Sequence, residues 1–344
     1  MIEEIKLSIE VLALDRNEYY FEHHPQVLAS FHLCNSQNYS RYASNDGHTQ
    51  MLNSLALLLK IEAENITLAH GAEDALIKAL SWLKLKYKTI VVDDFSWTNY
   101  IHIAEGLGYQ VHKIPTQMSG NSFILNIAGL KNHLNKCEPS VILLTSPNNP
   151  TGHSISQNEL YSLLKTYPEH FFILDMVYAP FFEQTYFCLM NHENSLFVGS
   201  FSKYFGLPGL RVGFAVGLLP KAFKLNLGLQ PQAIHICQTV LNHINWYQSN
   251  RSEMIQFAQA LLEKKYKNIK PFKSDAPFIL VQLVRVKSLQ KILLSAEEMT
   301  FVRPKYLVKD NVPYIRFGLG PAHVCAKIED YLTFIDKKFD ENSF

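Results

Sequence analysis

From about residue 70 onward, short apolar runs alternate with stretches that have helical spacing. The strand-like runs are "KTIVVDD", "SVILLTSP", "HFFILDM", "SLFVGSFS" and "RVGFAVG". The cores "SVILL" and "FFIL" are almost wholly apolar, which is typical of strands buried on both faces of a sheet. Between them, Ser156 and Glu159 in "SQNELYSLLKTY" form a capping-box pattern that predicts a helix start. The alternation predicts an α/β fold with a mostly parallel sheet flanked by helices.

After about residue 235 the pattern changes to a long helical stretch, two strands and a terminal helix. The helical stretches are "EMIQFAQALLEKKYKNI" and "HVCAKIEDYLTFIDKKF", and the strands are "PFILVQL" and "PYIRFGLG". The sequence contains no Pro/Gly-rich linker and no internal repeat, so we expect two closely packed domains. We place the large α/β domain at residues 40–235 and a smaller α+β domain at residues 1–39 and 236–344.

The composition indicates a globular protein with a sizeable core, because 47% of the 344 residues are hydrophobic. Lys and Arg (32) outnumber Asp and Glu (31) by only one, so no overall field attracts nucleic acid or a membrane surface, and we expect small-molecule partners. The sequence has no signal-peptide pattern and no run of about 18 apolar residues, which favours a cytoplasmic location. We expect five reduced core thiols: Cys34, Cys137, Cys188, Cys237 and Cys325.

The stretch "SFSKYFGLPGLRVGF", from Ser200 to Phe214, sets a lysine and an arginine among apolar residues. Apolar neighbours disfavour a charged lysine and lower its pKa from about 10.4, which would free the amine of Lys203 for covalent chemistry. From this stretch alone, a surface loop whose charges face water is an equal alternative.

Polar and aromatic residues follow several of the predicted strands, where the ligands of open α/β sheets bind. Asn149 lies in the turn "NNPTG", Asp175 ends the strand "FFILD", and Tyr178 follows three residues later. Trp97 comes just after the strand "KTIVVDD", where its indole could stack on a flat ring. Taken singly, these residues also fit an ordinary turn, a helix-capping aspartate and a core tryptophan.

A possible anion site precedes an amphipathic helix in "LAHGAEDALIKAL". The free backbone amides of Ala72 and Glu73 could hold a phosphate at the positive end of this helix. Many helices begin in this way, so this pattern supports a phosphate site only together with the residues described above.

Together these groups match one ligand, with a flat ring, a phosphate arm, a ring nitrogen that pairs with a carboxylate, and an aldehyde that reacts with an amine. That ligand is pyridoxal phosphate. The motifs "SPNNPTG", "SFSKYFGLPGLRVGF" and "YIRFGLG" are similar to those of the fold-type I aminotransferases, in the same order and at about the same spacing. Within that group the chain resembles the histidinol-phosphate aminotransferase family.

The resemblance implies how the cofactor would be held. Lys203 would bond covalently to the cofactor's aldehyde, and Asp175 would pair with the ring nitrogen and keep it protonated. Asn149 and Tyr178 would bind the ring's 3-hydroxyl, and Trp97 would stack where the family usually has a tyrosine. The remaining expected cofactor-binding residues surround the phosphate: Ala72, Glu73, Ser200, Ser202 and Arg211.

The resemblance also implies substrate contacts and a partner. Tyr42 in "SRYAS" matches a tyrosine that reaches the cofactor phosphate of the neighbouring subunit, which implies a homodimer with shared active sites. Arg316 matches the arginine that grips the substrate's α-carboxylate. Asn17 and Tyr19 in "LDRNEYY" resemble a substrate-binding segment, and Arg303 in "FVRP" occupies a position from which an arginine can bind the substrate's distal phosphate.

Two positions depart from the family pattern. Met176 replaces an acidic residue that is not thought to touch the cofactor, so we expect catalysis to survive this change. Pro277 stands where the family usually carries an asparagine near the substrate, which leaves substrate specificity open.

The implied activity is that of a pyridoxal-phosphate-dependent aminotransferase in which Lys203 moves the substrate's α-proton as a general base and acid. It would exchange an amino group between an amino acid, glutamate in one half-reaction, and a keto compound. The favoured pair is histidinol phosphate and imidazole acetol phosphate. A phosphothreonine-type decarboxylase and an aminotransferase for another, aromatic amino acid share these motifs. A non-catalytic cofactor-binding module is a third class, and the intact Lys203, Asp175 and Arg211 count against it.

Overall fold

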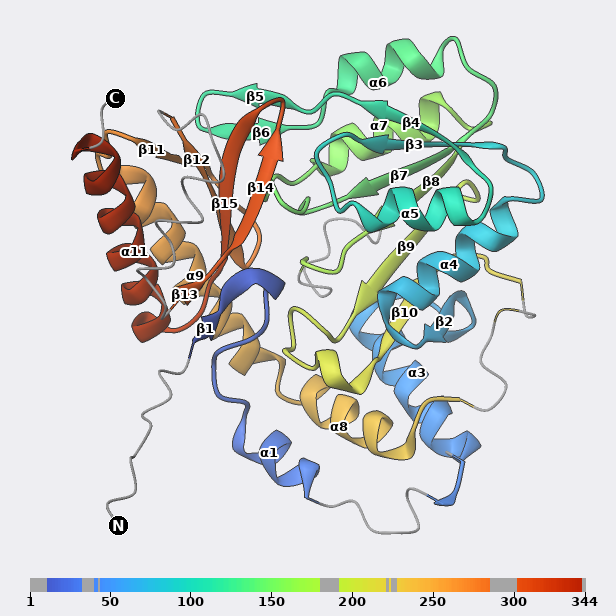
Figure 1. Cartoon of the computed structure of the whole chain (residues 1–344). Helices are drawn as coiled ribbons and strands as arrows, with labels where there is room; N and C mark the ends of the chain where they lie inside the picture. The colour runs from blue at the N-terminus through green and yellow to red at the C-terminus, as the bar shows by residue number, and fades with distance from the viewer. Residues whose placement is uncertain are drawn as a thin grey trace, which may run out of the picture.

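A seven-stranded sheet forms the larger part of the computed structural model (Figure 1), which describes residues 11–32, 40–42, 44–179, 192–220, 223, 228–284 and 302–341. Its strands are, in spatial order, β2 (Ile66–Ala69), β10 (Gly213–Val216), β9 (Ser195–Ser200), β8 (Phe171–Asp175), β7 (Val141–Thr145), β3 (Thr89–Asp93) and β4 (Gln110–Ile114). Among these strands β10 alone runs antiparallel to its neighbours. The sheet is therefore mixed but mostly parallel, as predicted.

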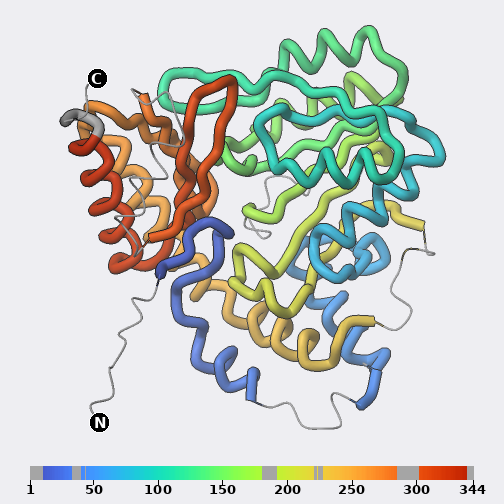
Figure 2. Tube along the Cα trace, in the orientation of Figure 1, coloured from blue at the N-terminus to red at the C-terminus, as the bar shows by residue number. Residues whose placement is uncertain are grey.

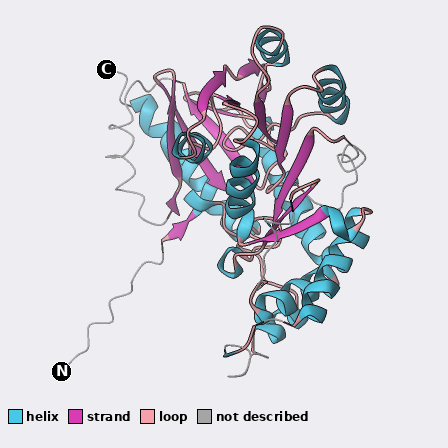
Figure 3. Cartoon of the chain, turned by 90° about the vertical axis from the view of Figure 1, so that its right-hand side faces the viewer, coloured by secondary structure: helices cyan, strands magenta, loops and turns pink. Residues whose placement is uncertain are grey.

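Helices cover both faces of this sheet (Figure 3). One face is covered by α4 (Gly71–Leu83) and α5 (Asn99–Gly106), and the other by α3 (Asn45–Leu59), α6 (Ile127–Leu134), α7 (Gln157–Thr166) and α8 (Pro231–Leu241). Alternate residues of one strand enter different cores: Ile90 and Val92 pack beneath α4 and α5, whereas Val91 packs on the opposite side. Burial on both faces explains why the central strands read as continuous apolar runs.

A second, antiparallel sheet lies beside the first. It consists of β11 (Ile269–Pro271), β12 (Phe278–Leu283), β15 (Val312–Gly318) and β14 (Lys305–Lys309), in that order. Helices α9 (Ile244–Glu263) and α11 (Ala322–Glu341) pack on its outer face around Ile279, Ile315 and Phe317 (Figure 1). A short parallel pair, β1 (Leu12–Ala13) and β13 (Val302–Arg303), extends this half of the molecule.

The two sheets are joined by an aromatic cluster and an ion pair. Phe95 and Phe123, from the part of the chain with the large sheet, pack with Phe272 and Tyr314 of the other part. Phe123 lies on a hairpin formed by β5 (Gln117–Ser119) and β6 (Ser122–Ile124). In addition, Lys309 Nζ lies 2.5 Å from a carboxylate oxygen of Asp94.

The N-terminal segment bridges both halves, as the blue end of the tube shows (Figure 2). Leu14, in the short 3-10 helix η1 (Leu14–Arg16), belongs to the core beneath α9 and α11. Val27, in α1 (Pro25–Phe31), belongs to the core on the α3 and α8 side of the large sheet. Leu14 therefore packs with the smaller antiparallel sheet, and Val27 packs with the large sheet.

Most predicted elements form close to their expected bounds. The capping box of α7 is present, with Ser156 and Glu159 bonding each other's backbone amides. The helix expected from residue 253 to 269 instead begins at Ile244 and ends at Glu263, because Lys264 turns into extended backbone before β11. Among the described residues, none of the helices has the length and apolarity needed to cross a membrane.

The cysteines match the prediction in part. Cys237 and Cys325 are buried free thiols, whereas Cys137 is only partly buried. Cys34 and Cys188 lie outside the described residues.

Candidate active site

Sheet register gathers the expected phosphate-binding residues at one end of β9, β10 and β2. Gly213 pairs with Ser200 on one side and with Ala69 on the other. Just beyond these positions, the Ser200 hydroxyl donates a 2.9 Å hydrogen bond to Ser202 Oγ. Helix α4 begins at Gly71, two residues after Ala69. The backbone amide of Ala72, in the first turn of this helix, is therefore near Ser200 and Ser202.

Two glycines allow this close assembly. A Cβ added to Gly213 would lie 2.4 Å from the carbonyl carbon of Gly71 and 2.7 Å from the amide nitrogen of Ala72. A Cβ on Gly71, whose φ is +85°, would lie 2.7 Å from Nη2 of Arg211. The guanidinium of Arg211 therefore lies directly against the first turn of α4, where it adds positive charge to the helix N-terminus.

Asp175 lies fully buried at the carboxyl end of β8. Its Oδ2 accepts a 2.8 Å hydrogen bond from the Tyr100 hydroxyl, and its Oδ1 accepts one of 2.9 Å from the amide of Val177. Burial raises the pKa of Asp175 to about 6, although both hydrogen bonds act to lower it. Both of these donors are neutral, so the carboxylate can still pair with a cation.

Asn149 and Tyr178 lie together, as the sequence predicted, and Asn17 joins them. The Tyr178 hydroxyl accepts hydrogen bonds from Asn17 Nδ2 at 3.2 Å and from Asn149 Nδ2 at 3.4 Å. Asn149 lies in the loop after β7, and its neighbour Asn148 fixes that loop by a 2.9 Å hydrogen bond to the carbonyl of Phe95. Two amides therefore surround one phenol at the end of the sheet.

Lys203 follows β9 and extends into the same region. Its Nζ donates a 2.5 Å hydrogen bond to the carbonyl of Arg16, in the N-terminal segment. Burial lowers its pKa to about 8, helped by the positive charges of Arg316 and Arg211 and opposed by Glu18. The sequence-based expectation of a lysine with a depressed pKa agrees with this direction.

Arg316 is buried on β15 and points away from the core that holds its neighbours Ile315 and Phe317. Its Nη1 donates to the Oδ1 of Asn149, and its Nη2 donates a 2.5 Å hydrogen bond to the carbonyl of Asp15. Burial lowers its pKa. Both acceptors are neutral, which leaves the guanidinium suited to an incoming anion.

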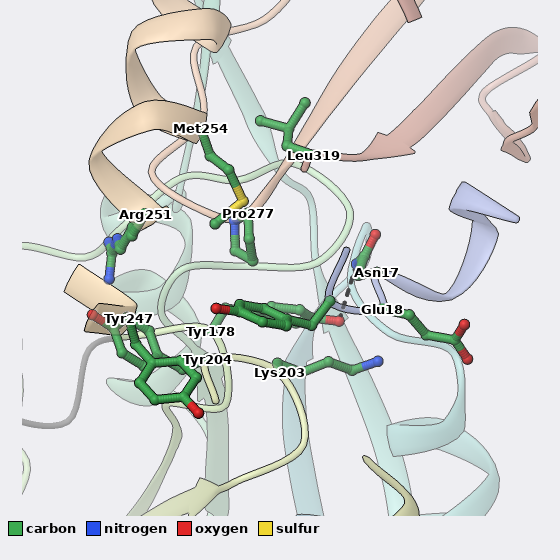
Figure 4. Close-up of a pocket in the computed structure, with 11 residues that line it drawn as sticks. Asn17, Glu18, Tyr178, Lys203, Tyr204, Tyr247, Arg251, Met254, Pro277 and Leu319 are labelled. Atoms are coloured by element: carbon green, nitrogen blue, oxygen red, sulfur yellow. Dashed lines mark hydrogen bonds between the residues drawn. The ribbon is translucent and has the colours of Figure 1, made fainter. Parts of the chain in front are cut away.

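A pocket opens beside Lys203 (Figure 4). Asn17, Glu18 and Tyr178 line it near the lysine. The rest of its wall includes Tyr204, Tyr247, Arg251, Met254 and Pro277. Pro277, singled out from the sequence as a departure from the family pattern, therefore contributes to the same cavity as Lys203.

Other expected site residues lie at different distances from this pocket. Trp97 is half-buried and packs edge-on against Tyr100, with ring centroids 5.1 Å apart. Tyr19 lines the pocket, and its hydroxyl accepts a 2.6 Å hydrogen bond from Asn250. Arg303 does not line it: its side chain is 57% exposed and lies 3.5 Å from Asp15 Oδ1.

Two further expected residues complete this comparison. Tyr42 is 75% exposed and stands in the loop before α3, so within one chain it does not contribute to the pocket. Glu73 is half-buried in the first turn of α4. Glu73 therefore lies beside the expected phosphate site of its own chain, and Tyr42 does not line the pocket of its own chain.

Sequence reasoning missed several residues of the site. Tyr100 follows Trp97 by three residues, and this helical spacing would have placed the two rings together. Tyr247, Arg251 and Met254 recur at spacings of four and three, so they share one face of α9. That face combines aromatic, basic and apolar residues at helical spacing, a pattern that the sequence itself shows.

The arrangement fits pyridoxal phosphate. The tight contact of Gly213 with Gly71 and Ala72 leaves a cradle of serine hydroxyls, helix amides and one guanidinium, which are phosphate ligands. The buried carboxylate of Asp175 suits a ring nitrogen that carries a proton, and Lys203 provides an amine of lowered pKa. No residue at these positions conflicts with the cofactor predicted from the sequence.

The model of the family "Aminotransferase class I and II" matches residues 9–333. The chain is 26% identical over 319 residues to histidinol-phosphate aminotransferase 2 of Archaeoglobus fulgidus, an alignment that covers 90% of this chain and 89% of the relative. A second relative, histidinol-phosphate aminotransferase 2 of Legionella pneumophila (strain Paris), is 27% identical over 214 residues, which cover 60% of this chain and 57% of that protein.

Solved structures share the fold. A histidinol-phosphate aminotransferase from Sinorhizobium meliloti, in complex with pyridoxal-5'-phosphate, superposes with a TM-score of 0.77 at 17% identity and covers 96% of this chain and 92% of its own. An L-threonine-O-3-phosphate decarboxylase from Porphyromonas gingivalis gives a TM-score of 0.69 at 18% identity, with 94% and 100% coverage. The predicted fold type, a large α/β part with a smaller α+β part, is thus confirmed.

Proposed function

We propose, from the premise that this chain belongs to the aminotransferase class I and II family, that it transfers the amino group of glutamate to a phosphorylated keto compound. Its cofactor is pyridoxal phosphate. The favoured phosphorylated pair is histidinol phosphate and imidazole acetol phosphate. The observation that carries the proposal is the convergence of Lys203, with a pKa of about 8, and Arg316, a buried guanidinium bonded only to neutral oxygens in the contacts described above.

Different residues of the site would bind different parts of the cofactor. When bound, pyridoxal phosphate supplies an electron sink for the charge left when a bond at the substrate's α-carbon breaks. Asp175 would hold the ring nitrogen by its carboxylate, and Asn149 and Tyr178 would hold the 3-hydroxyl. Ser200, Ser202, Arg211 and the amides of Ala72 and Glu73 would hold the phosphate.

Lys203 is suited to move the α-proton. An amine with a pKa of about 8 can both accept and release a proton near neutral pH, which is what a residue acting first as base and then as acid needs. Arg316 would orient glutamate by a two-bond contact with its α-carboxylate, and this fixes the α-carbon within reach of Lys203.

Two observations support the proposed substrate: the names of the relatives and the position of Arg303. Relatives such as that of Archaeoglobus fulgidus carry the name histidinol-phosphate aminotransferase, at 26% identity. Arg303 interacts with Asp15, whose carbonyl is bonded by Arg316, so the two arginines share one neighbour. We propose that Arg303 meets the distal anion of the phosphorylated substrate at the outer side of Asp15.

Two further parts of the proposal concern assembly and location. We propose a homodimer in which Tyr42, exposed in the single chain, reaches the cofactor phosphate of the neighbouring subunit. A cytoplasmic location remains a prediction from the sequence.

A half-reaction screen tests the function. The purified holoenzyme is mixed with single amines, namely glutamate, aromatic amino acids, histidinol phosphate, histidinol and phosphothreonine, and the cofactor's visible absorbance is followed. We expect conversion with glutamate and with histidinol phosphate, and little with unphosphorylated histidinol. Release of carbon dioxide from phosphothreonine would identify a decarboxylase instead, and faster conversion of an aromatic amino acid would contradict histidinol phosphate as substrate.

A further inference from the structure

A chain of buried hydrogen bonds ends on the imidazole of His153, in the loop between β7 and α7. Asn148 Nδ2 donates a 2.9 Å hydrogen bond to the carbonyl of Phe95 and one of 2.6 Å to Thr151 Oγ1. Thr151 Oγ1 in turn lies 2.8 Å from Nδ1 of His153. Thr151 is fully buried, and His153 is 7% exposed. The loop that carries Asn149 is therefore held by the side chains on both sides of that residue.

The direction of these bonds shows which atom of His153 carries no proton. A backbone carbonyl can only accept, so the amide nitrogen of Asn148 faces it, and the same nitrogen donates to Thr151. Among the contacts of the described residues, the Thr151 hydroxyl proton then has Nδ1 of His153 as its acceptor. Burial lowers the pKa of His153 to about 4, against the opposing charges of Asp275 and Glu159, so the ring is neutral near neutral pH.

The backbone of the same loop closes around this chain of side chains. The amide of Asn148 donates a 2.8 Å hydrogen bond to the carbonyl of His153, and the amide of Gly152 donates one of 2.7 Å to the carbonyl of Asn148. The carbonyl of Gly152 accepts a 2.8 Å hydrogen bond from the amide of Asp275, in the segment before β12. A shift of His153 in so compact a turn would therefore move both neighbours of Asn149.

Asn149 is the residue of this turn that faces the site. Its Nδ2 donates to the Tyr178 hydroxyl, and its Oδ1 accepts from Arg316. Without an acceptor on residue 153, the Thr151 hydroxyl would have to reorient or stay unbonded in the interior, and both changes cost free energy. Reorientation would displace the Asn149 amide from the place where it would meet the cofactor's 3-hydroxyl.

We propose that His153 is a positioning residue, which holds Thr151 by a ring nitrogen and thereby fixes the Asn149 amide at the cofactor's 3-hydroxyl. This inference rests on the proposed function, because it assumes that Asn149 binds that hydroxyl. His153 does not line the pocket beside Lys203, so it acts only through the turn.

The test compares two unreactive analogues of pyridoxal phosphate by calorimetry on the full-length, cofactor-free protein. The first has a methyl group in place of the aldehyde, so it cannot react with Lys203, and the second also lacks the 3-hydroxyl. We expect the wild type to bind the first about tenfold more tightly than the second, and His153→Leu to lose most of this preference. A role of His153 in stability alone would weaken binding of both analogues equally and leave their ratio unchanged.

Three further variants separate the acceptor atom from the rest of the side chain. His153→Asn places an oxygen close to the position of Nδ1, so it should keep most of the preference. Thr151→Val removes the hydroxyl with little change in shape and should lose the preference, which covers the case in which His153→Leu does not fold. His170→Leu is the matched control and should keep it. His170 is also buried, and its Nδ1 accepts a 3.1 Å hydrogen bond from the amide of Ser140, at the end of β8 opposite Asp175.

An unchanged preference in both His153→Leu and Thr151→Val, or an equal loss of preference in His170→Leu, would overturn the inference. Asn149→Ala should abolish the preference by itself. If the wild type shows no preference, or Asn149→Ala keeps it, the proposed contact of Asn149 with the 3-hydroxyl fails, and the inference fails with it. If the preference depends on His153 while the amine screen detects no transamination, the proposed activity fails and the positioning role stands.

Discussion

The Tyr100 hydroxyl lies 2.8 Å from Asp175 Oδ2 and also accepts a 3.0 Å hydrogen bond from Thr145 Oγ1. Tyr100 is buried on α5, whereas Asp175 and Thr145 are paired residues at the ends of neighbouring strands. This chain of hydrogen bonds holds the Asp175 carboxylate in one orientation and lowers its pKa against the effect of burial. Tyr100 is therefore a positioning residue for the carboxylate.

Replacing Tyr100 by Phe should raise the pKa of Asp175 above its present value of about 6, because a hydrogen bond to the charged form is lost. The acidic limb of the pH profile of kcat should move to higher pH, and kcat at neutral pH should fall by about tenfold or more, the value of a hydrogen bond to a charged group. The measurement is a full pH profile of the holoenzyme. Tyr109→Phe is a matched control, since it removes a 2.8 Å hydrogen bond to the carbonyl of Leu80 away from the site. Identical profiles for all three proteins would show that Tyr100 has no such role.

Lys203 should react with the cofactor with a pH midpoint near 8. Only the neutral amine can attack the aldehyde, and the pKa of this lysine lies below the usual 10.5 because it is buried. Below pH 8 the reaction should slow, and above it the rate should level off. The rate is followed by absorbance after mixing cofactor-free protein with pyridoxal phosphate.

Borohydride reduction and peptide mapping then identify the modified residue. Lys203→Ala should give no modified peptide and should lose at least about a hundredfold in turnover. A midpoint close to 10.5, or a label on a different lysine, would refute the assignment.

Gly213→Ala should weaken cofactor binding. Its new Cβ would lie within 2.4 Å of the Gly71 backbone, so β10 and the start of α4 would have to separate where the phosphate is expected. We expect a loss of about 1–3 kcal/mol in the free energy of unfolding, measured by urea titration, together with a higher Kd for pyridoxal phosphate. Gly106→Ala, where an added Cβ meets no atom within 4 Å, should leave the Kd unchanged and should not lower the free energy of unfolding, because alanine is the better helix former.

Tyr42→Phe and Lys203→Ala should complement each other if sites are shared between subunits. In a hybrid dimer one site would carry both defects, and the other would pair an intact Lys203 with an intact Tyr42. Activity after the chains are unfolded together and refolded should therefore exceed the mean of the two separate preparations. An active monomer in sedimentation at assay concentration would exclude this arrangement.

Arg303→Ala should affect the two substrates unequally. Loss of one charge-assisted bond should raise KM for the phosphorylated amine by about ten- to hundredfold and leave KM for glutamate nearly the same. Arg316→Lys should raise KM for glutamate, because it removes the two-bond fork that holds the α-carboxylate. The measurement is steady-state kinetics with each substrate varied in turn. Equal effects of Arg303→Ala on KM for both substrates would contradict a role of Arg303 in binding the phosphate.

The sequence was sufficient to predict residues whose position depends on strand ends. Asp175 and Asn149 follow neighbouring parallel strands, so their proximity comes directly from the fold. The proximity of Asp175 and Asn149 needs only local pattern and sheet direction. The resemblance, in contrast, was needed to group Arg211 with the amides of Ala72 and Glu73, and the Arg211 side chain lies against Gly71 at the start of α4.

Other relationships depend on which face of an element a side chain occupies. Val302 is buried and Arg303 is exposed on the same two-residue strand, and no pattern in so short a strand tells which of the two points inward. Arg251 reaches the pocket because α9 begins nine residues earlier than the helical pattern was placed. The contact of Tyr100 with Asp175 could be predicted only by knowing that the buried face of α5 is turned toward β8.

The hydrogen bond from Arg316 to the carbonyl of Asp15 joins residues 301 positions apart, and that from Lys203 to Arg16 joins residues 187 apart. During synthesis Asp15 emerges 301 residues before Arg316, which lies on β15. The large sheet can form before this moment, but the substrate end of the site cannot, because loop closure over such distances is slow and comes late. The nascent chain should therefore bind its cofactor before it can tell one amino acid from another.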